Sequence, residues 1–136
     1  LGAAFHLARA AIPGMQARGW GRIIHISGKD AFQPGPGRAH NVAAKAGLHG
    51  FTKALAVEFG PDGITVNTIS PGKLETQRDP AVMARIRDEW AQARATVPLR
   101  RLGTPEDVAL ACVYLCGPGA FMTGQVLHLN GGDAMF

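Results

Sequence analysis

The sequence is poor in the residues that hold small proteins together covalently or through metals. It has two cysteines, Cys112 and Cys116, which are spaced four apart without a CxxC or His/Cys cluster. A disulfide framework and a zinc site are therefore not predicted, and a reducing compartment is expected. No apolar stretch is long enough to span a bilayer, and the first residues show no signal-peptide pattern. We therefore expect a cytoplasmic protein without a membrane partner.

The sequence also has only a small excess of charge of one sign. Fourteen Lys and Arg stand against ten Asp and Glu, a net charge of +4, and the arginines of residues 78–101 lie among acids. This pattern is typical of a solvated surface, so no nucleic acid partner is expected. With 136 residues and 46% hydrophobic content, the chain fits one globular domain at most, residues 1–136.

A third absence concerns nucleotide binding. The pyrophosphate of a dinucleotide is commonly held at a helix N-terminus by a G-x-G-x-x-G turn that follows a strand. Glycine is abundant, with 18 residues, but no glycine-rich segment of the chain has that spacing between a strand and a helix. The sequence therefore lacks the usual seat for a pyrophosphate.

What the sequence does contain is a regular alternation of helix and strand patterns. Asp79 before Pro80, and Thr104 before Pro105, are typical helix starts. Alternating strands and helices predict an α/β fold in which three parallel strands are flanked by helices. The predicted helices cover 1–18, 38–59, a segment from 80 and a segment from 105 to 116, and the predicted strands cover 22–27, 64–69 and 125–129.

Three segments resemble the short-chain dehydrogenase/reductase family. They are GRIIHISGKDAFQPGPGRAHNVAAK (21–45), ITVNTISPGKLET (64–76) and GQVLHLNGG (124–132), in register over nearly the whole chain. The resemblance implies the C-terminal half of a Rossmann-like doubly wound parallel sheet, hence a truncated domain. It also implies descent from an NAD- or NADP-dependent oxidoreductase of alcohols and ketones.

The same resemblance shows a degenerate catalytic set. Lys45 matches the family lysine, but the tyrosine position four residues earlier is Asn41. The serine position, thirteen residues before that, is Gly28, and Ser27 is one place too early. A shift of one residue at a strand end turns the side chain to the other face. Because a carboxamide does not titrate near neutral pH, Asn41 cannot act as general acid or base.

The resemblance also assigns cofactor contacts. Lys45 is expected at the nicotinamide ribose, and Pro71, Gly72 and Thr76 match the family segment beside the nicotinamide. Because the glycine-rich turn is absent, we expect this chain to bind NAD or NADP weakly. If it is an oxidoreductase, another proton donor is needed, and water or His40 is the candidate.

Partners are predicted from two features. Helix 38–59 carries a stripe of small residues, which are Ala43, Gly47, Gly50 and Ala54. The stripe resembles the family dimer surface, although packing against the chain's own sheet explains it equally well. Strand 22–27 would expose an unpaired apolar edge. We expect a homo-oligomer or a missing N-terminal half to cover it, and a non-catalytic scaffold that uses the dimer surface is the first alternative function.

A hydrolase is the second alternative. Ser27 with His25 or His40 and with Asp30 would form a nucleophile, a base and an orienting acid. His25 and Ser27 share a strand face, which favours the idea. The local sequence His-Ile-Ser-Gly-Lys lacks the G-x-S-x-G elbow, which argues against it.

Overall fold

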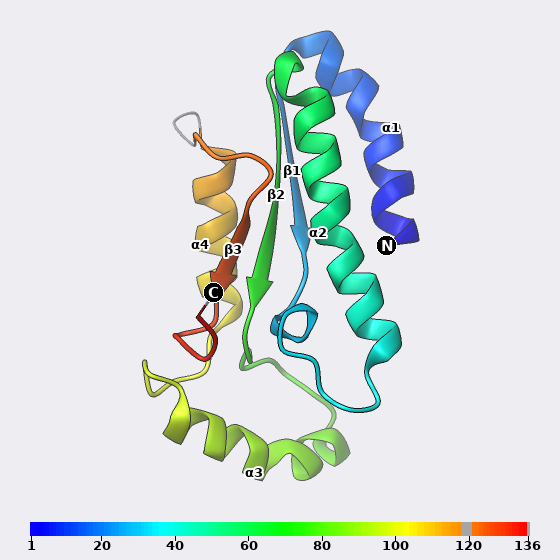
Figure 1. Cartoon of the computed structure of the whole chain (residues 1–136). Helices are drawn as coiled ribbons and strands as arrows, with labels where there is room; N and C mark the ends of the chain where they lie inside the picture. The colour runs from blue at the N-terminus through cyan, green and yellow to red at the C-terminus, as the bar shows by residue number, and fades with distance from the viewer. Residues whose placement is uncertain (118–120, 136) are drawn as a thin grey trace.

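The structure is a computed structural model that describes residues 1–117 and 121–135 (Figure 1). It has three strands and four α-helices in these residues, with two short 3-10 turns between them. The elements are α1 (Gly2–Arg18), β1 (Gly21–Ile26), η1 (Lys29–Ala31), α2 (Ala39–Phe59), η2 (Gly60–Asp62), β2 (Ile64–Pro71), α3 (Pro80–Thr96), α4 (Pro105–Cys116) and β3 (Val126–Leu129).

The three strands form one parallel sheet, as predicted, and their order is β1-β2-β3. Gly21 pairs with Ile64 and Ile26 with Ile69, while Thr68 pairs with Val126 on the other side of β2. β2 is therefore the central strand, and its near-continuous burial reflects coverage on both faces.

Helices cover the two faces of the sheet in separate layers. Figure 1 shows α1 and α2 side by side against one face and α4 against the other. Ile12 of α1 and Leu55 of α2 pack with Val66 of β2. On the opposite face Leu115 of α4 packs with Ile69. Alternate residues of β2 thus face different helices, which is the period of a strand.

The helix starts follow the local signals. The Asp79 carboxylate accepts a hydrogen bond from the backbone N–H of Ala81 at 2.8 Å. Thr104 and Asp107 form a reciprocal capping box. α3 crosses the end of the sheet where β1 and β2 finish, and places its buried Trp90 there.

In the described residues the sheet has two edge strands, β1 and β3. β1 is the edge that the sequence predicted. Ile26 is 43% exposed on this edge. An apolar groove of about 490 Å³ runs between β1 and α1. Within the described part of the chain, no helix is long and apolar enough to cross a membrane, and no cluster of three metal-ligating side chains occurs. The cytoplasmic location stays a prediction.

Candidate functional site

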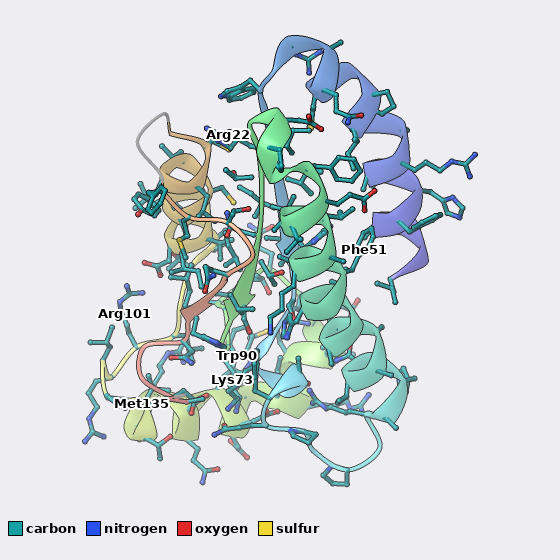
Figure 2. The ribbon with its side chains drawn as sticks, turned by 45° about the horizontal axis from the view of Figure 1, so that its top comes forward. Arg22, Phe51, Lys73, Trp90, Arg101 and Met135 are labelled. Atoms are coloured by element: carbon teal, nitrogen blue, oxygen red, sulfur yellow. The ribbon has the colours of Figure 1, made fainter. Side chains whose placement is uncertain are left out.

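A cleft of about 830 Å³ lies at the carboxyl ends of β1 and β2. Parallel α/β sheets bind ligands at this edge, because loops and helix N-termini converge there. α3 closes its far side, where Lys73 and Trp90 stand close together (Figure 2). Seven of the residues proposed for the site line it: Ser27, Gly28, Asn41, Lys45, Pro71, Gly72 and Thr76.

α2 supplies one wall of the cleft. Asn41 and Lys45 are one turn apart, so they project from the same face of the helix. The Lys45 Nζ donates a hydrogen bond to the backbone carbonyl of Ile26 at 2.8 Å. This contact ties the ammonium to the end of β1 and fixes a positive charge beside Asn41.

The end of β2 supplies the opposite wall. β2 continues to Pro71, two residues beyond the predicted strand, and the Gly72 N–H donates to the Leu129 carbonyl at 2.9 Å. A Cβ on Gly72 would lie 2.9 Å from the Cα of Asn130. Only glycine therefore permits this close approach of the two backbones, which shapes the cleft.

Charged side chains around the cleft are predominantly basic, five against two acidic ones. Several are held in ion pairs: Lys29 with Asp133 and Arg38 with Asp30, both at 2.5 Å, and Lys73 with Glu89 at 3.0 Å. Such a surface favours an anionic ligand by long-range attraction.

Ser27 is directed away from the position that Gly28 occupies. Its Oγ lies 2.7 Å from the Nε2 of His49 on α2 and 3.3 Å from the Lys45 carbonyl. The His49 ring stacks on Phe32, with centroids 4.6 Å apart and an interplanar angle of 23°. Burial, with smaller effects from His128 and Lys53, lowers the pKa of His49 below its ordinary value. The imidazole is therefore neutral near pH 7.

A second histidine contact lies deeper between β1 and α2. The His25 Nδ1 is 2.7 Å from the Thr52 Oγ1, which in turn is 2.7 Å from the Thr68 Oγ1. Both threonines are fully buried. We call His25, Thr52 and Thr68 the buried row. Burial lowers the pKa of His25, so the buried row is also neutral near pH 7.

The predicted hydrolase partners of Ser27 need correction. His25 bonds to Thr52, and Asp30 pairs with Arg38, so neither contacts Ser27 through a hydrogen bond. His40 is exposed at the start of α2 and is not among the residues that line the cleft. The geometry instead pairs Ser27 with His49, because Ser27 faces α2 and not the sheet edge.

His49 is the site residue that the sequence reasoning missed. Its signal was present in the spacing: positions 45, 49 and 52 recur on one face of a helix. Polar residues at 25 and 27 recur on one face of the strand. Only the packing of that helix face on that strand face reveals that the two sets meet.

Comparisons with known proteins agree with this architecture. The family model described as "Enoyl-(Acyl carrier protein) reductase" matches residues 1–133. An acetoacetyl-CoA reductase of Cupriavidus necator is 43% identical over 94% of this chain and 51% of its own length. A 3-oxoacyl-[acyl-carrier-protein] reductase of Vibrio cholerae is 41% identical over 96% of this chain and 53% of its own.

Solved structures agree as well. A putative NAD(P) dependent gluconate 5-dehydrogenase from Beutenbergia cavernae, with bound NADP at low occupancy, superposes with a TM-score of 0.88 and 37% identity. It is matched over 97% of this chain and 53% of its own. A 3-oxoacyl-[acyl-carrier protein] reductase from Brucella melitensis gives a TM-score of 0.89 at 34% identity, over all of this chain and 50% of its own.

The chain therefore belongs to the short-chain dehydrogenase/reductase family. It spans about half the length of the curated relatives that it matches.

Proposed function

We propose that this chain supplies the C-terminal half of an NAD(P)-dependent oxidoreductase of alcohols and ketones, with a degenerate acid–base set. The observation that carries the proposal is the cleft itself. It gathers Lys45, Gly72 and Thr76 from separate elements, at the sheet edge where this fold binds ligands. Asn41 and Gly28 occupy the family's tyrosine and serine positions in the same cleft.

A dinucleotide fits this cleft in part. The basic lining suits a phosphate-bearing ligand. When bound, the nicotinamide supplies the site of hydride transfer, and Lys45 would hold its ribose while Pro71, Gly72 and Thr76 border the ring. The described residues include no glycine-rich turn at a helix N-terminus, so the pyrophosphate lacks its amide cradle. The chain by itself should therefore bind the cofactor weakly.

Acid–base chemistry needs a group other than residue 41. The Asn41 carboxamide can hydrogen-bond a substrate oxygen but cannot exchange a proton with it. The Lys45 ammonium donates one of its three N–H groups to the Ile26 carbonyl and would hold the ribose with another. His40, the earlier candidate, lies outside the cleft lining and would need water to reach the substrate. Another group in the wall of the cleft must therefore donate the proton.

The test combines cofactor binding with complementation. Calorimetry on the purified chain should show no micromolar binding of NADH or NADPH. The chain mixed with the N-terminal half of an acetoacetyl-CoA reductase should bind the cofactor and reduce a member of a ketone panel that includes acetoacetyl-CoA. Turnover by the chain alone would contradict the proposal, as would an inactive mixture that nevertheless assembles and binds cofactor.

Restoring the family residues sharpens this test. Asn41→Tyr with Gly28→Ser returns a phenol one turn from the Lys45 charge, which favours the phenolate. In the complemented protein the pair of changes should raise turnover, by at most the roughly hundred- to ten-thousand-fold that general acid–base catalysis contributes. The same double variant without the N-terminal half should stay inactive, because the hydride donor is not positioned.

A hydrolase remains a second candidate because Ser27 Oγ lies 2.7 Å from His49 Nε2, the contact of a nucleophile with its base. Among the described residues no carboxylate bonds to the other ring nitrogen of His49. Hydrolysis of an activated ester that disappears in Ser27→Ala would favour this candidate over an oxidoreductase.

We also propose that the chain self-associates through α2. Gly50 and Ala54 of the small-residue stripe are exposed, which favours an outer contact over packing against the chain's own sheet. A Cβ at Gly50 meets nothing within 4 Å, whereas one at Gly47 would lie 3.0 Å from the Leu1 side chain. Gly50→Leu is therefore the clean test, and a light-scattering mass that it leaves unchanged would contradict the proposed interface. Assembly without turnover would favour the scaffold alternative.

A further inference from the structure

We propose that Ser27 and His49 form the proton-transfer group of this cleft, with Ser27 contacting the substrate oxygen and His49 holding the proton behind it. The inference rests on the proposed oxidoreductase function and names the group that takes the place of the missing phenol. It concerns a serine that lies one position away from the family's catalytic serine and a histidine on the helix behind it.

Position is the first argument. Ser27 is 7% exposed and is among the residues that line the same cleft as Asn41 and Lys45, so a substrate oxygen in the cleft would lie near it. His49 is half-buried on α2 directly behind that hydroxyl. A substrate proton could therefore reach His49 through one intervening hydroxyl, without His49 entering the cleft.

Hydrogen-bond geometry decides between two arrangements. Ser27 has one proton, which it donates either to His49 Nε2 at 2.7 Å or to the Lys45 carbonyl at 3.3 Å. The distance to the carbonyl exceeds the usual range for a hydroxyl donor, about 2.5–3.0 Å. Donation to His49 is therefore favoured, which requires the Nδ1–H tautomer and leaves Nε2 as the acceptor.

Packing holds the imidazole in that orientation. The His49 ring stacks on Phe32, and Phe32 also makes an edge contact with His128 at 4.6 Å between centroids. The ring thus has a fixed plane between α2, the turn after η1 and β3. A base that is fixed by packing needs little reorganisation when the proton moves.

Electrostatics around His49 support a neutral base. Burial lowers its pKa first, followed by the charges of His128 on β3 and Lys53 on α2. The other titratable or charged groups on the packed elements are His40, Lys45 and Glu58 on α2, Arg22 and His25 on β1, and Lys29 and Asp30 on η1. Lys29 and Asp30 are held in ion pairs. The free imidazole is therefore the form present near pH 7 and can accept a proton.

The proton step balances as follows for alcohol oxidation. The substrate O–H bond breaks and its proton passes to Ser27 Oγ, while the original Ser27 proton passes to His49 Nε2. The electron pair of the O–H bond would form the second bond of the carbonyl, and the dinucleotide of the proposed function would supply the acceptor for the C–H electron pair, which leaves as hydride. Ketone reduction is the reverse, and His49 then supplies the proton.

The chain contains a matched control for this pair. His25 and Thr52 make the same kind of contact across the same β1–α2 interface, also at 2.7 Å, but they do not line the cleft. Weakening either pair removes one histidine–hydroxyl contact between the strand and the helix. Only a change in the Ser27–His49 pair should affect proton transfer.

The first experiment needs no turnover. Nitrogen-15 NMR of the imidazoles in the purified chain should show the Nδ1–H tautomer at His49 near pH 7, with a pKa below 6.5. Ser27→Ala should change the His49 tautomer signal and leave His25 unchanged. A protonated Nε2 at neutral pH in the unaltered chain would overturn the proposal, because the pair could not then accept a proton.

The second experiment uses the complemented protein. Ser27→Ala and His49→Gln should each lower kcat by roughly a hundred- to ten-thousand-fold, with a much smaller change in KM. Both should remove the inflection of the kcat–pH profile that coincides with the NMR pKa of His49. His25→Gln should keep that inflection, and circular dichroism should show that each variant folds.

The outcomes separate the two proposals. Ser27→Ala could leave turnover within about threefold of its original value and keep the same inflection. This result would overturn the proton-transfer role, because removal of a general acid or base typically causes far larger losses. The oxidoreductase function would still stand. An assembled, cofactor-bound protein that turns over no ketone or alcohol overturns both. If His49→Gln does not fold, Ser27→Ala alone decides, because it removes only one hydroxyl.

Discussion

Two histidine–hydroxyl contacts cross the same interface between β1 and α2, yet they lie in different environments. His25 meets Thr52, and Ser27 meets His49, both at 2.7 Å. Thr52 passes its hydrogen bond on to Thr68, and both threonines have 0% exposure. Ser27 instead reaches the cleft. His25 and Ser27 are both 7% exposed, so the two pairs differ in their surroundings: Ser27 borders the cleft, whereas the hydroxyls bonded to His25 lie in the core.

The difference follows from where the strand ends. β1 ends at Ile26, so His25 lies within the sheet and Ser27 lies just beyond it, at the carboxyl edge where the cleft opens. A buried polar row in the sheet is stabilising only while every member is bonded. A polar pair at the edge can exchange partners with a ligand or with water. The first pair should therefore control stability and the second should control chemistry.

Thr52→Val tests the buried row most severely. The change removes the hydroxyl between His25 and Thr68 and leaves two buried polar groups without that partner. Each unsatisfied group costs about 1–3 kcal/mol, so the free energy of unfolding should fall by about 2–6 kcal/mol. Urea denaturation measures it, and Thr65→Val at a half-buried position of β2 is the matched control. Equal losses in the two variants would break the comparison.

The pH dependence of stability tests the same row through its histidine. Burial lowers the folded pKa of His25 below the 6.5 of the unfolded chain, so protons favour unfolding. Stability should be unaffected above pH 6.5 and fall as the pH drops from there toward the folded pKa, by about 1.4 kcal/mol for each pKa unit of difference.

His25→Gln should make this fall shallower, since the amide can still bond Thr52 but does not titrate. His49 and His128 have lowered pKa values too and should account for the slope that remains. Denaturation at several pH values between 7 and 5 measures the slope. An unchanged slope in His25→Gln would show that the buried row does not control acid stability.

Ser27→Ala should have the smallest effect on stability. Its hydroxyl makes one short contact, to His49 Nε2 at 2.7 Å, so shortening the side chain removes about one hydrogen bond. The free energy of unfolding should fall by about 1 kcal/mol or less, the usual net value of one hydrogen bond. A loss as large as that of Thr52→Val would indicate that Ser27 serves mainly to fasten α2 to β1.

Much of the fold could be predicted because its signals are local. The apolar run before Ser27 predicted β1, and the pairs Asp79-Pro80 and Thr104-Pro105 predicted the starts of α3 and α4 within a residue. The parallel direction of the three strands followed from their alternation with helices. Each of these depends on neighbours in the chain, and tertiary contacts did not override them.

The site could be predicted only where residues lie close together in the sequence. Asn41 and Lys45 share a helix face whatever the helix packs against, so their common location in the cleft was readable. The wrong partners for Ser27 came from searching nearby in sequence, at His25 and Asp30. Its hydrogen-bond partner is 22 positions away.

The sequence by itself determined the elements, their parallel arrangement, the family, and the absence of a titratable group at position 41, since all of these follow from local pattern and residue chemistry. Only the tertiary structure decided which histidine meets Ser27. That choice depends on how α2 is rotated and shifted over β1, which is set by the packing of Leu55, Ala56 and Val66 in the core. A rotation of one residue on the helix is about 100°, enough to replace His49 by a different side chain.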